Sequence, residues 1–218
     1  MKIIIKYSRD GAAKYISHLD MQRAFGRALR RANIDVQYSQ GFNPHIVMSF
    51  ASPLSVGYAT NGDYLEVAMN TKSNPCEIKE ALNAVLTADI RILNVRFCET
   101  NKKLMAQNHS ASYQITFYFE NEENCVKMNE LVKKIMEAQS FLAIDRKGKE
   151  IDIRPLILEL SSEKNVLYAL LQNSSENALN PAVVANVCKG TGAVEEIRRI
   201  ECFAAVQQKV LPFYELDD

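Results

Sequence analysis

Residues 15–57 read YISHLDMQRAFGRALRRANIDVQYSQGFNPHIVMSFASPLSVG. Near the start of this stretch, Met21, Phe25 and Leu29 recur at the spacing of one helical face, and the pattern predicts an amphipathic helix. After Tyr38 comes a run rich in glycine, asparagine and proline, which is typical of a turn or loop. The stretch therefore predicts a helix, a strand and a glycine–proline loop within one α+β unit.

Local signals define both ends of the predicted helix. Ser17 or Asp20 can accept hydrogen bonds from the first backbone N–H groups, so the helix is expected to start near residues 17–20. Asn33 tolerates the left-handed conformation in which many helices end. At ~1.5 Å per residue, the helix is about 20 Å long.

The face opposite the apolar one carries positive charge. Arg23, Arg27 and Arg30 lie along it, and Arg31 flanks them. Residues 1–31 hold eight Lys or Arg and two Asp, whereas the whole chain is formally neutral. Two interpretations stay open. The charges either keep an exposed helix soluble, or form a group of guanidinium ions with few acidic neighbours that binds phosphates.

Two histidines lie beside this helix. His18 stands at its expected start, where it can be structural, bind phosphate or act as a general base on a ribose hydroxyl. His45 follows Gly41 and Pro44, in a loop that is either a plain turn or a carrier of backbone amides and an imidazole to a ligand. No third ligand stands at a convincing spacing for a metal, and no metal or other cofactor is expected.

Aromatic residues accompany the basic and glycine-rich segments. Tyr15, Tyr38 and Phe42 either stack on unpaired bases or pack in the core and its rim. The phosphate-binding hypothesis predicts a set of ligand-binding residues: Tyr15, Ser17, His18, Arg23, Arg27, Arg30, Arg31, Tyr38, Gln40, Gly41, Phe42, Asn43 and His45. If the protein is catalytic, His18 and His45 are the candidates.

Composition narrows the class of protein. No apolar run approaches the ~20 residues of a membrane-spanning helix, and the first residues have too short an apolar core for a signal peptide. The five cysteines are far apart and form no Cys-x-x-Cys pair. Such cysteines are typical of reduced thiols, and we expect a cytoplasmic protein.

The predicted elements follow the same order in both halves of the chain. Strands or extended segments are expected at 2–7, 35–39, 45–51, 63–70, 90–97, 113–119, 141–146, 150–153, 156–160, 166–171 and 195–205. Helices are expected up to Asn33 in the opening stretch and at 75–86, 122–139 and 181–187. This order predicts tandem ferredoxin-like (split βαβ) domains of α+β class, with antiparallel sheets and helices on one face. The domains are expected at 1–100 and 111–218, with a linker at 100–110.

Four strings of the opening stretch resemble the family of radical-SAM-linked proteins: residues 15–20, 23–31, 38–45 and 49–57. Ile46 departs from that family's pattern, which often has proline there. Members are encoded beside, or fused to, a radical SAM enzyme, so the resemblance implies such an enzyme as a partner. The chain lacks the clustered Cys-x-x-x-Cys-x-x-Cys that binds such an enzyme's iron–sulfur cluster, and it is not expected to be the enzyme itself.

These features predict an accessory protein that binds RNA or a phosphate ligand and assists a radical SAM enzyme in RNA or ribosome-related modification. One alternative is a protein-interaction adaptor for that enzyme without nucleic-acid binding. Another is a metal-independent endoribonuclease with His18 as base, since the element order also resembles tandem ferredoxin-like proteins that process CRISPR RNA. The oligomeric state and the identity of the ligand stay open.

Overall fold

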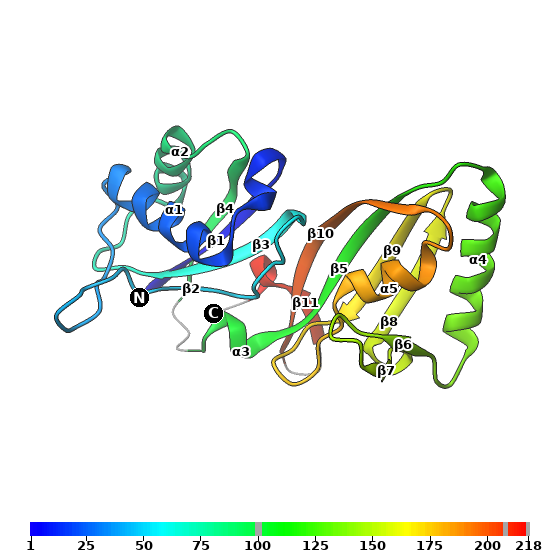
Figure 1. The fold of residues 1–218 in the computed structure, drawn as a ribbon. Helices are drawn as coiled ribbons and strands as arrows, with labels where there is room; N and C mark the ends of the chain where they lie inside the picture. Colours follow the sequence, from blue (N-terminus) through cyan, green and yellow to red (C-terminus); the bar gives the residue numbers. More distant parts are fainter. Residues whose placement is uncertain (99–101, 207–208, 217–218) are drawn as a thin grey trace. The chain divides into compact units, whose positions relative to one another are not determined.

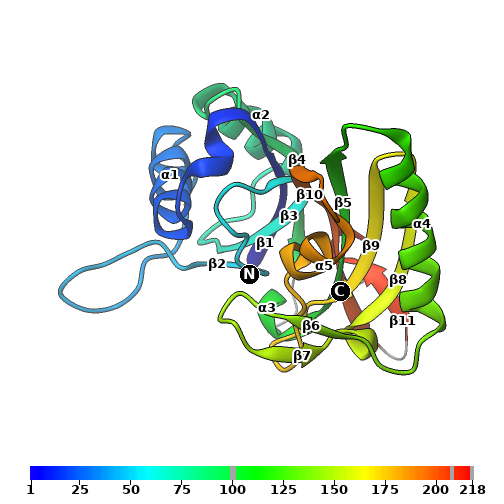
Figure 2. The same cartoon turned by 45° about the vertical axis from the view of Figure 1, so that its right-hand side comes forward.

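The computed structural model describes residues 1–98, 102–206 and 209–216. The protein has an α+β fold, and its strands pair in a largely antiparallel manner (Figure 1). The chain divides into two compact units, one formed by Met1–Asn108 with Cys202–Asp218 and the other by His109–Glu201. Figure 2 shows the same elements from a second direction.

The first unit holds two long helices and the strands that surround them in sequence. Its elements are β1 (Lys2–Arg9), η1 (Gly11–Tyr15), α1 (His18–Arg31), β2 (Met48–Phe50), β3 (Ala59–Ala68), α2 (Pro75–Val85), β4 (Ile90–Cys98), α3 (Leu104–Gln107), β11 (Lys209–Pro212) and η3 (Phe213–Glu215). The strands lie in the order β4-β1-β3, and β2 pairs with β3. All of these pairs are antiparallel.

Helices α1 and α2 pack on one face of this sheet. The buried cluster joins Ile3 and Ile5 of β1 to Phe25 and Leu29 of α1 and to Leu82 of α2. Because side chains alternate along a strand, the odd-numbered residues of β1 face the helices. Burial of these apolar side chains fixes α1 against the sheet and leaves its arginine face exposed.

The opposite face of the sheet is covered within the same unit by η3. The rings of Tyr64 in β3 and Phe213 in η3 lie 5.2 Å apart, and both residues are buried. The ammonium of Lys6 lies 4.4 Å from the centre of the Tyr214 ring, a cation–π contact. The last described residues therefore belong to the core of the first unit.

The structure confirms both predicted ends of α1. Ser17 is the N-cap, and its side chain accepts a hydrogen bond from the Asp20 backbone N–H at 3.1 Å. Asn33, two residues beyond the helix, has a left-handed φ of 53°. These local signals set the length of the helix and the position of each arginine on it.

The second unit holds the remaining elements: β5 (Asn108–Tyr118), α4 (Glu122–Glu137), β6 (Leu142–Ile144), β7 (Glu150–Asp152), η2 (Arg154–Leu156), β8 (Ile157–Glu163), β9 (Val166–Gln172), α5 (Pro181–Cys188) and most of β10 (Ala193–Val206). The residues of β10 from Cys202 onward group with the first unit. Its strands follow the order β10-β5-β9-β8. The β6–β7 hairpin forms a separate two-stranded sheet.

Three expectations differ from the structure. The predicted strand 35–39 is reduced to two isolated bridges, Val36 with Met69 and Tyr38 with Ile46, because its backbone pairing passes at Gln37 from residues 68–69 to residues 45–47. Within the predicted linker 100–110, α3 forms and β5 starts at Asn108, while residues 100 and 101 lie outside the described residues. The predicted domain 111–218 also differs, since Cys202–Asp218 groups with the first unit.

The described part of the chain contains no disulfide and no helix that could span a membrane. All five cysteines lie within it, and none of them forms a disulfide. Cys188 is buried, and this burial raises the pKa of its thiol to about 12. Among the described helices, none is long and apolar enough to cross a bilayer.

Candidate anion-binding groove

A groove of about 600 Å³ runs between helix α1 and the chain segment that follows its loop. Three arginines line its helix side: Arg23, Arg27 and Arg30. Pro44, His45, Ile46 and Met48 line the other side. The arginine helix and the glycine–proline loop thus line the same groove, although they are separate parts of the sequence.

Gly26 keeps the floor of this groove open. It is buried in the middle of α1, and a Cβ added there would lie 3.6 Å from the Met48 Cε atom. That distance is an ordinary van der Waals contact, so the glycine leaves room for about one methyl group. A longer side chain at this position would extend into the groove.

The arginines of the groove differ in their partners. Arg23 is paired with Asp20, with Nη1 at 2.9 Å from Oδ1 on an exposed surface. The hydrogen bond from Ser17, followed by that from Arg23, lowers the pKa of the Asp20 carboxyl. Within residues 1–98, 102–206 and 209–216, neither Arg27 nor Arg30 has a hydrogen-bond or ion-pair partner. These two exposed guanidinium groups are available to a ligand.

Arg31 is directed elsewhere, although the sequence grouped it with the other three. Its Nη2 donates a hydrogen bond of 2.5 Å to the carbonyl of Val85, the last residue of α2. The last carbonyls of a helix lack partners within the helix and carry partial negative charge. Arg31 therefore ties α1 to the end of α2, and it is absent from the groove lining.

His45 is held at the base of its loop by Ser39. The Ser39 hydroxyl accepts a hydrogen bond from the His45 backbone N–H at 3.1 Å, and it lies 2.9 Å from Nδ1 of the ring. The Ser39 backbone N–H also donates to the His45 carbonyl at 2.8 Å. The Ser39 hydroxyl can donate its proton to Nδ1 or accept one from it, so this contact fixes the orientation of the ring in either tautomer.

The tip of this loop is fully exposed. Gln40, Gly41, Phe42, Asn43 and Pro44 all lie in water, and the relative exposure of Phe42 reaches 106%. Gly41 has a φ of +122°, which favours glycine. Both views show the light-blue loop between α1 and β2 extending away from the helices of its unit (Figures 1 and 2).

Three further predicted site residues, Tyr15, His18 and Tyr38, do not line the groove. His18 packs its ring on Phe50, with centroids 5.1 Å apart, and it is not among the groove-lining residues. Burial and then the charge of Arg9 lower the pKa of His18. Tyr15 is exposed, with the Lys14 ammonium 5.5 Å from its ring centre, and Tyr38 is also exposed. The structure therefore brings His45 to the arginines and leaves His18 in a more apolar setting.

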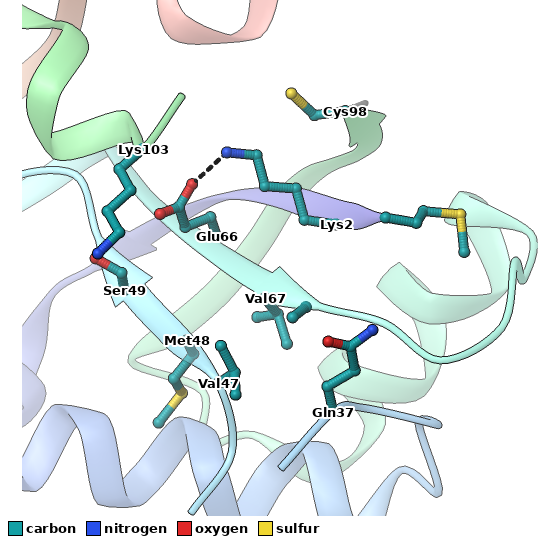
Figure 3. Close-up of a pocket in the computed structure, with 11 residues that line it drawn as sticks. Lys2, Gln37, Val47, Met48, Ser49, Glu66, Val67, Cys98 and Lys103 are labelled. Atoms are coloured by element: carbon teal, nitrogen blue, oxygen red, sulfur yellow. Dashed lines mark hydrogen bonds and ion pairs between the residues drawn. The ribbon is translucent and has the colours of Figure 1, made fainter. Parts of the chain in front are cut away.

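A second hollow in the first unit has a different charge pattern, and sequence reasoning did not find it. Lys2 and Glu66 form an ion pair of 2.7 Å inside a cavity of about 340 Å³ (Figure 3). Val47, Ser49 and Lys103 line the same cavity, and the Lys103 side chain ends beside Ser49. Glu66 neutralises Lys2, so this hollow contains an acidic side chain, which the groove lining lacks. Lys2 and Glu66 are 64 residues apart, and no local pattern links them.

No group of three or more His, Cys, Asp or Glu side chains in the described residues could hold a metal ion.

Comparison with protein families finds one whose description reads "Uncharacterized protein conserved in bacteria (DUF2344)", and it matches residues 2–181. No curated protein matches the chain. The family match spans α1, the glycine–proline loop and the whole groove lining.

Proposed function

The chain belongs to the DUF2344 family, and from its groove we propose that it is an accessory protein that binds RNA or another phosphate-bearing ligand. One observation carries the proposal. Arg27 and Arg30 have no hydrogen-bond or ion-pair partner in the described residues, and they share a groove with His45. Phosphate is the ligand class that best fits two guanidinium groups beside an imidazole.

The helix presents these groups in a regular row. Arg23, Arg27 and Arg30 are spaced four and three residues apart, so they lie along one face and span about 10 Å. A row of cations on a rigid element can neutralise successive phosphates of a strand without ordering a flexible segment first. The ion pair of this row, between Arg23 and Asp20, is solvent-exposed. Such exposed pairs are worth little, and a phosphate can displace Asp20 at low cost.

We also propose that each unit is a ferredoxin-like, split βαβ module. The strand orders support this: β4-β1-β3 with β2 paired to β3 in one unit, and β10-β5-β9-β8 in the other. In each unit a helix follows the first strand, and a second helix precedes the strand that pairs beside the first one. This is the element order of the split βαβ fold.

The proposed setting is the cytoplasm, where the protein would assist a radical SAM enzyme in RNA or ribosome-related modification. The five cysteines support a reducing compartment, since none of them forms a disulfide. The partner is proposed on the sequence resemblance of residues 15–57 to the radical-SAM-linked family. The enzyme would supply the chemistry, and this chain would hold the nucleic acid.

A protein-interaction adaptor is the second candidate, because the exposed Phe42 ring at a loop tip also suits insertion into a partner protein.

The endoribonuclease with His18 as base has less support. His18 packs on Phe50 and does not line the groove that holds the arginines. A general base must come within hydrogen-bond reach of the hydroxyl it deprotonates.

Filter binding of RNA across a salt series tests the proposal. The logarithm of affinity is expected to fall with the logarithm of salt concentration, by about 0.7 for each phosphate contacted on a single strand. In the double variant Arg27→Ala/Arg30→Ala, the affinity is expected to drop and the slope to become shallower by about 1.4. Arg91→Ala removes an equally exposed arginine of β4 and serves as the matched control.

Two results would reject RNA binding through this groove. One is an affinity that does not depend on salt, and the other is equal affinity of the wild type and the double variant. Capture of the radical SAM enzyme from nuclease-treated extract by the double variant, together with absent RNA binding by the wild type, would support the adaptor instead.

A further inference from the structure

We propose that the groove binds a single strand of nucleic acid, one unpaired base of which stacks on Phe42 while phosphates of the same strand lie on Arg27 and Arg30. The inference rests on the proposed function, and it narrows the ligand from any phosphate-bearing molecule to single-stranded nucleic acid. It is carried by the combination of an exposed aromatic ring, a braced loop and the adjoining arginines.

The exposed Phe42 ring is unusual in its setting. Its relative exposure of 106% means that no other part of the described chain covers it. A loop tip of this kind normally carries small polar residues, and Gln40, Gly41 and Asn43 around it follow that rule. An aromatic ring without intramolecular contact leaves both of its faces open to stacking by a base.

The base of the loop is braced, which prepares the ring for binding. The His45 backbone N–H donates to the Ser39 hydroxyl, and the Ser39 backbone N–H donates to the His45 carbonyl. The Ser39 hydroxyl also contacts Nδ1 of the His45 ring. Pro44 further restricts the backbone within the loop. Less conformational freedom is then lost when a base stacks on the ring.

The loop that carries the ring also forms one wall of the groove. Pro44 lines the groove and is two residues from Phe42, so their Cα atoms lie at most about 7 Å apart. A single strand whose phosphates lie on the arginines can therefore place one of its bases on the ring as it leaves the groove. His45 lines the groove beside Pro44, where Nε2 of its ring can hydrogen-bond to a ribose hydroxyl.

This geometry selects against duplexes. In a double helix both faces of each base are already stacked on neighbouring bases, and Phe42 would have no base face to contact. Single strands expose these faces, and stacking on aromatic side chains tolerates any base. A phosphate ligand without bases would use the arginines alone.

The chain contains no tryptophan, and this permits a direct test. Phe42→Trp introduces a single indole at the loop tip, and its fluorescence is recorded during titration with a single-stranded oligoribonucleotide. The expected result is quenching of the indole emission on binding, with affinity close to that of the wild type. The same strand in a blunt duplex, and inorganic polyphosphate, are expected to leave the emission unchanged.

Replacement of the ring gives the second measurement. Phe42→Ala is expected to weaken single-strand binding by about 5- to 150-fold, the range measured for one stacked base. Phe42→Leu keeps an apolar side chain without an aromatic face, and it is expected to lose nearly as much. Binding of the duplex and of polyphosphate is expected to be the same in all three proteins.

The possible failures are distinguishable. If RNA binds in an arginine-dependent manner without indole quenching and without loss in Phe42→Ala, the proposed function stands and the stacking inference is overturned. If Phe42→Ala keeps RNA affinity but no longer captures the radical SAM enzyme, the tip contacts protein and the inference is again overturned. If no RNA binds to the wild type, both proposals fail together.

Discussion

Ser39 and His45 are joined across the base of the glycine–proline loop, with the serine hydroxyl 2.9 Å from Nδ1 of the imidazole. The same hydroxyl accepts the His45 backbone N–H. One small side chain thus fixes both the loop closure and the orientation of the imidazole that lines the groove. Neither effect involves the buried core, so the pair can be changed without unfolding the protein.

Ser39→Ala is expected to weaken RNA binding by about 2- to 10-fold, the equivalent of one hydrogen bond of ordinary strength. The free energy of unfolding is expected to change by less than about 1 kcal/mol, because the loop is exposed. Filter binding and urea denaturation measure the two quantities. Ser161→Ala, an exposed serine of the second unit, is the control. Unchanged binding in Ser39→Ala would show that the brace does not position the site.

His18 is expected to make stability depend on pH. Burial and the charge of Arg9 lower its pKa, so below pH ~6.5 the unfolded chain binds more protons than the folded chain at this residue. Stability is therefore complete above about pH 6.5 and falls as the pH drops below it. Urea midpoints at pH 7.5 and pH 5.5 are expected to differ less in His18→Gln than in the wild type.

The Asp20 carboxyl does not contribute to the difference in urea midpoint between pH 7.5 and pH 5.5. The pKa of Asp20 is lowered by its hydrogen bonds from Ser17 and Arg23, so the stabilisation it provides is lost only at more acidic pH. An equal pH dependence in His18→Gln and the wild type would contradict the role assigned to burial of the His18 ring.

Replacement of Arg31 is expected to affect mainly the stability of the protein, and replacement of Arg27 mainly its RNA binding, although both lie on helix α1. Arg31→Ala removes the hydrogen bond to the Val85 carbonyl and is expected to lower the free energy of unfolding by about 0.5–1 kcal/mol. Arg27→Ala removes no hydrogen bond or ion pair within the described residues, only a longer-range attraction to the exposed Asp20, and is expected to change the free energy of unfolding by less than about 0.5 kcal/mol. RNA affinity is expected to show the opposite order, with the larger loss in Arg27→Ala. Urea denaturation and filter binding on both variants check this, and the reverse order would count against the groove.

Gly26→Ala is expected to stabilise the protein by about 0.5–1 kcal/mol, since alanine favours a helix interior more than glycine does. The added Cβ would meet Met48 at an ordinary contact distance of 3.6 Å. Gly192→Ala is the contrasting variant, because its Cβ would lie 2.7 Å from the Tyr118 carbonyl oxygen and closer still to Phe119. It is expected to destabilise by about 1–3 kcal/mol. Thermal or urea unfolding checks both signs.

Local chemistry made the first helix predictable. Ser17, Asn33 and the apolar spacing of Phe25 and Leu29 act within a few residues of each other, and the structure has the helix at His18–Arg31. The alternation of β1 and the Asn74–Pro75 start of α2 were predictable for the same reason. Signals of this kind do not depend on what the rest of the chain does.

Features set by distant partners were not predictable. Arg31 looked like its three neighbours on the helix, and only the fold brings the Val85 carbonyl, 54 residues away, within hydrogen-bond distance. Likewise, the segment 35–39 has strand-like residues, but its pairing depends on Met69 and Ile46 and stops at isolated bridges. His18 and His45 are both near the arginines in sequence, yet the packing of Phe50 on His18 distinguishes them.

The division of the chain has a consequence for its synthesis on the ribosome. The second unit is continuous in sequence, at His109–Glu201, whereas the first also requires residues that follow it. Phe213, which covers Tyr64, leaves the exit tunnel after the whole second unit has been made. Domains usually mature from the N-terminus as they are translated. Here the order is reversed, because the unit that carries the groove is completed last. The sheet face that Phe213 covers stays exposed while more than half of the chain is translated.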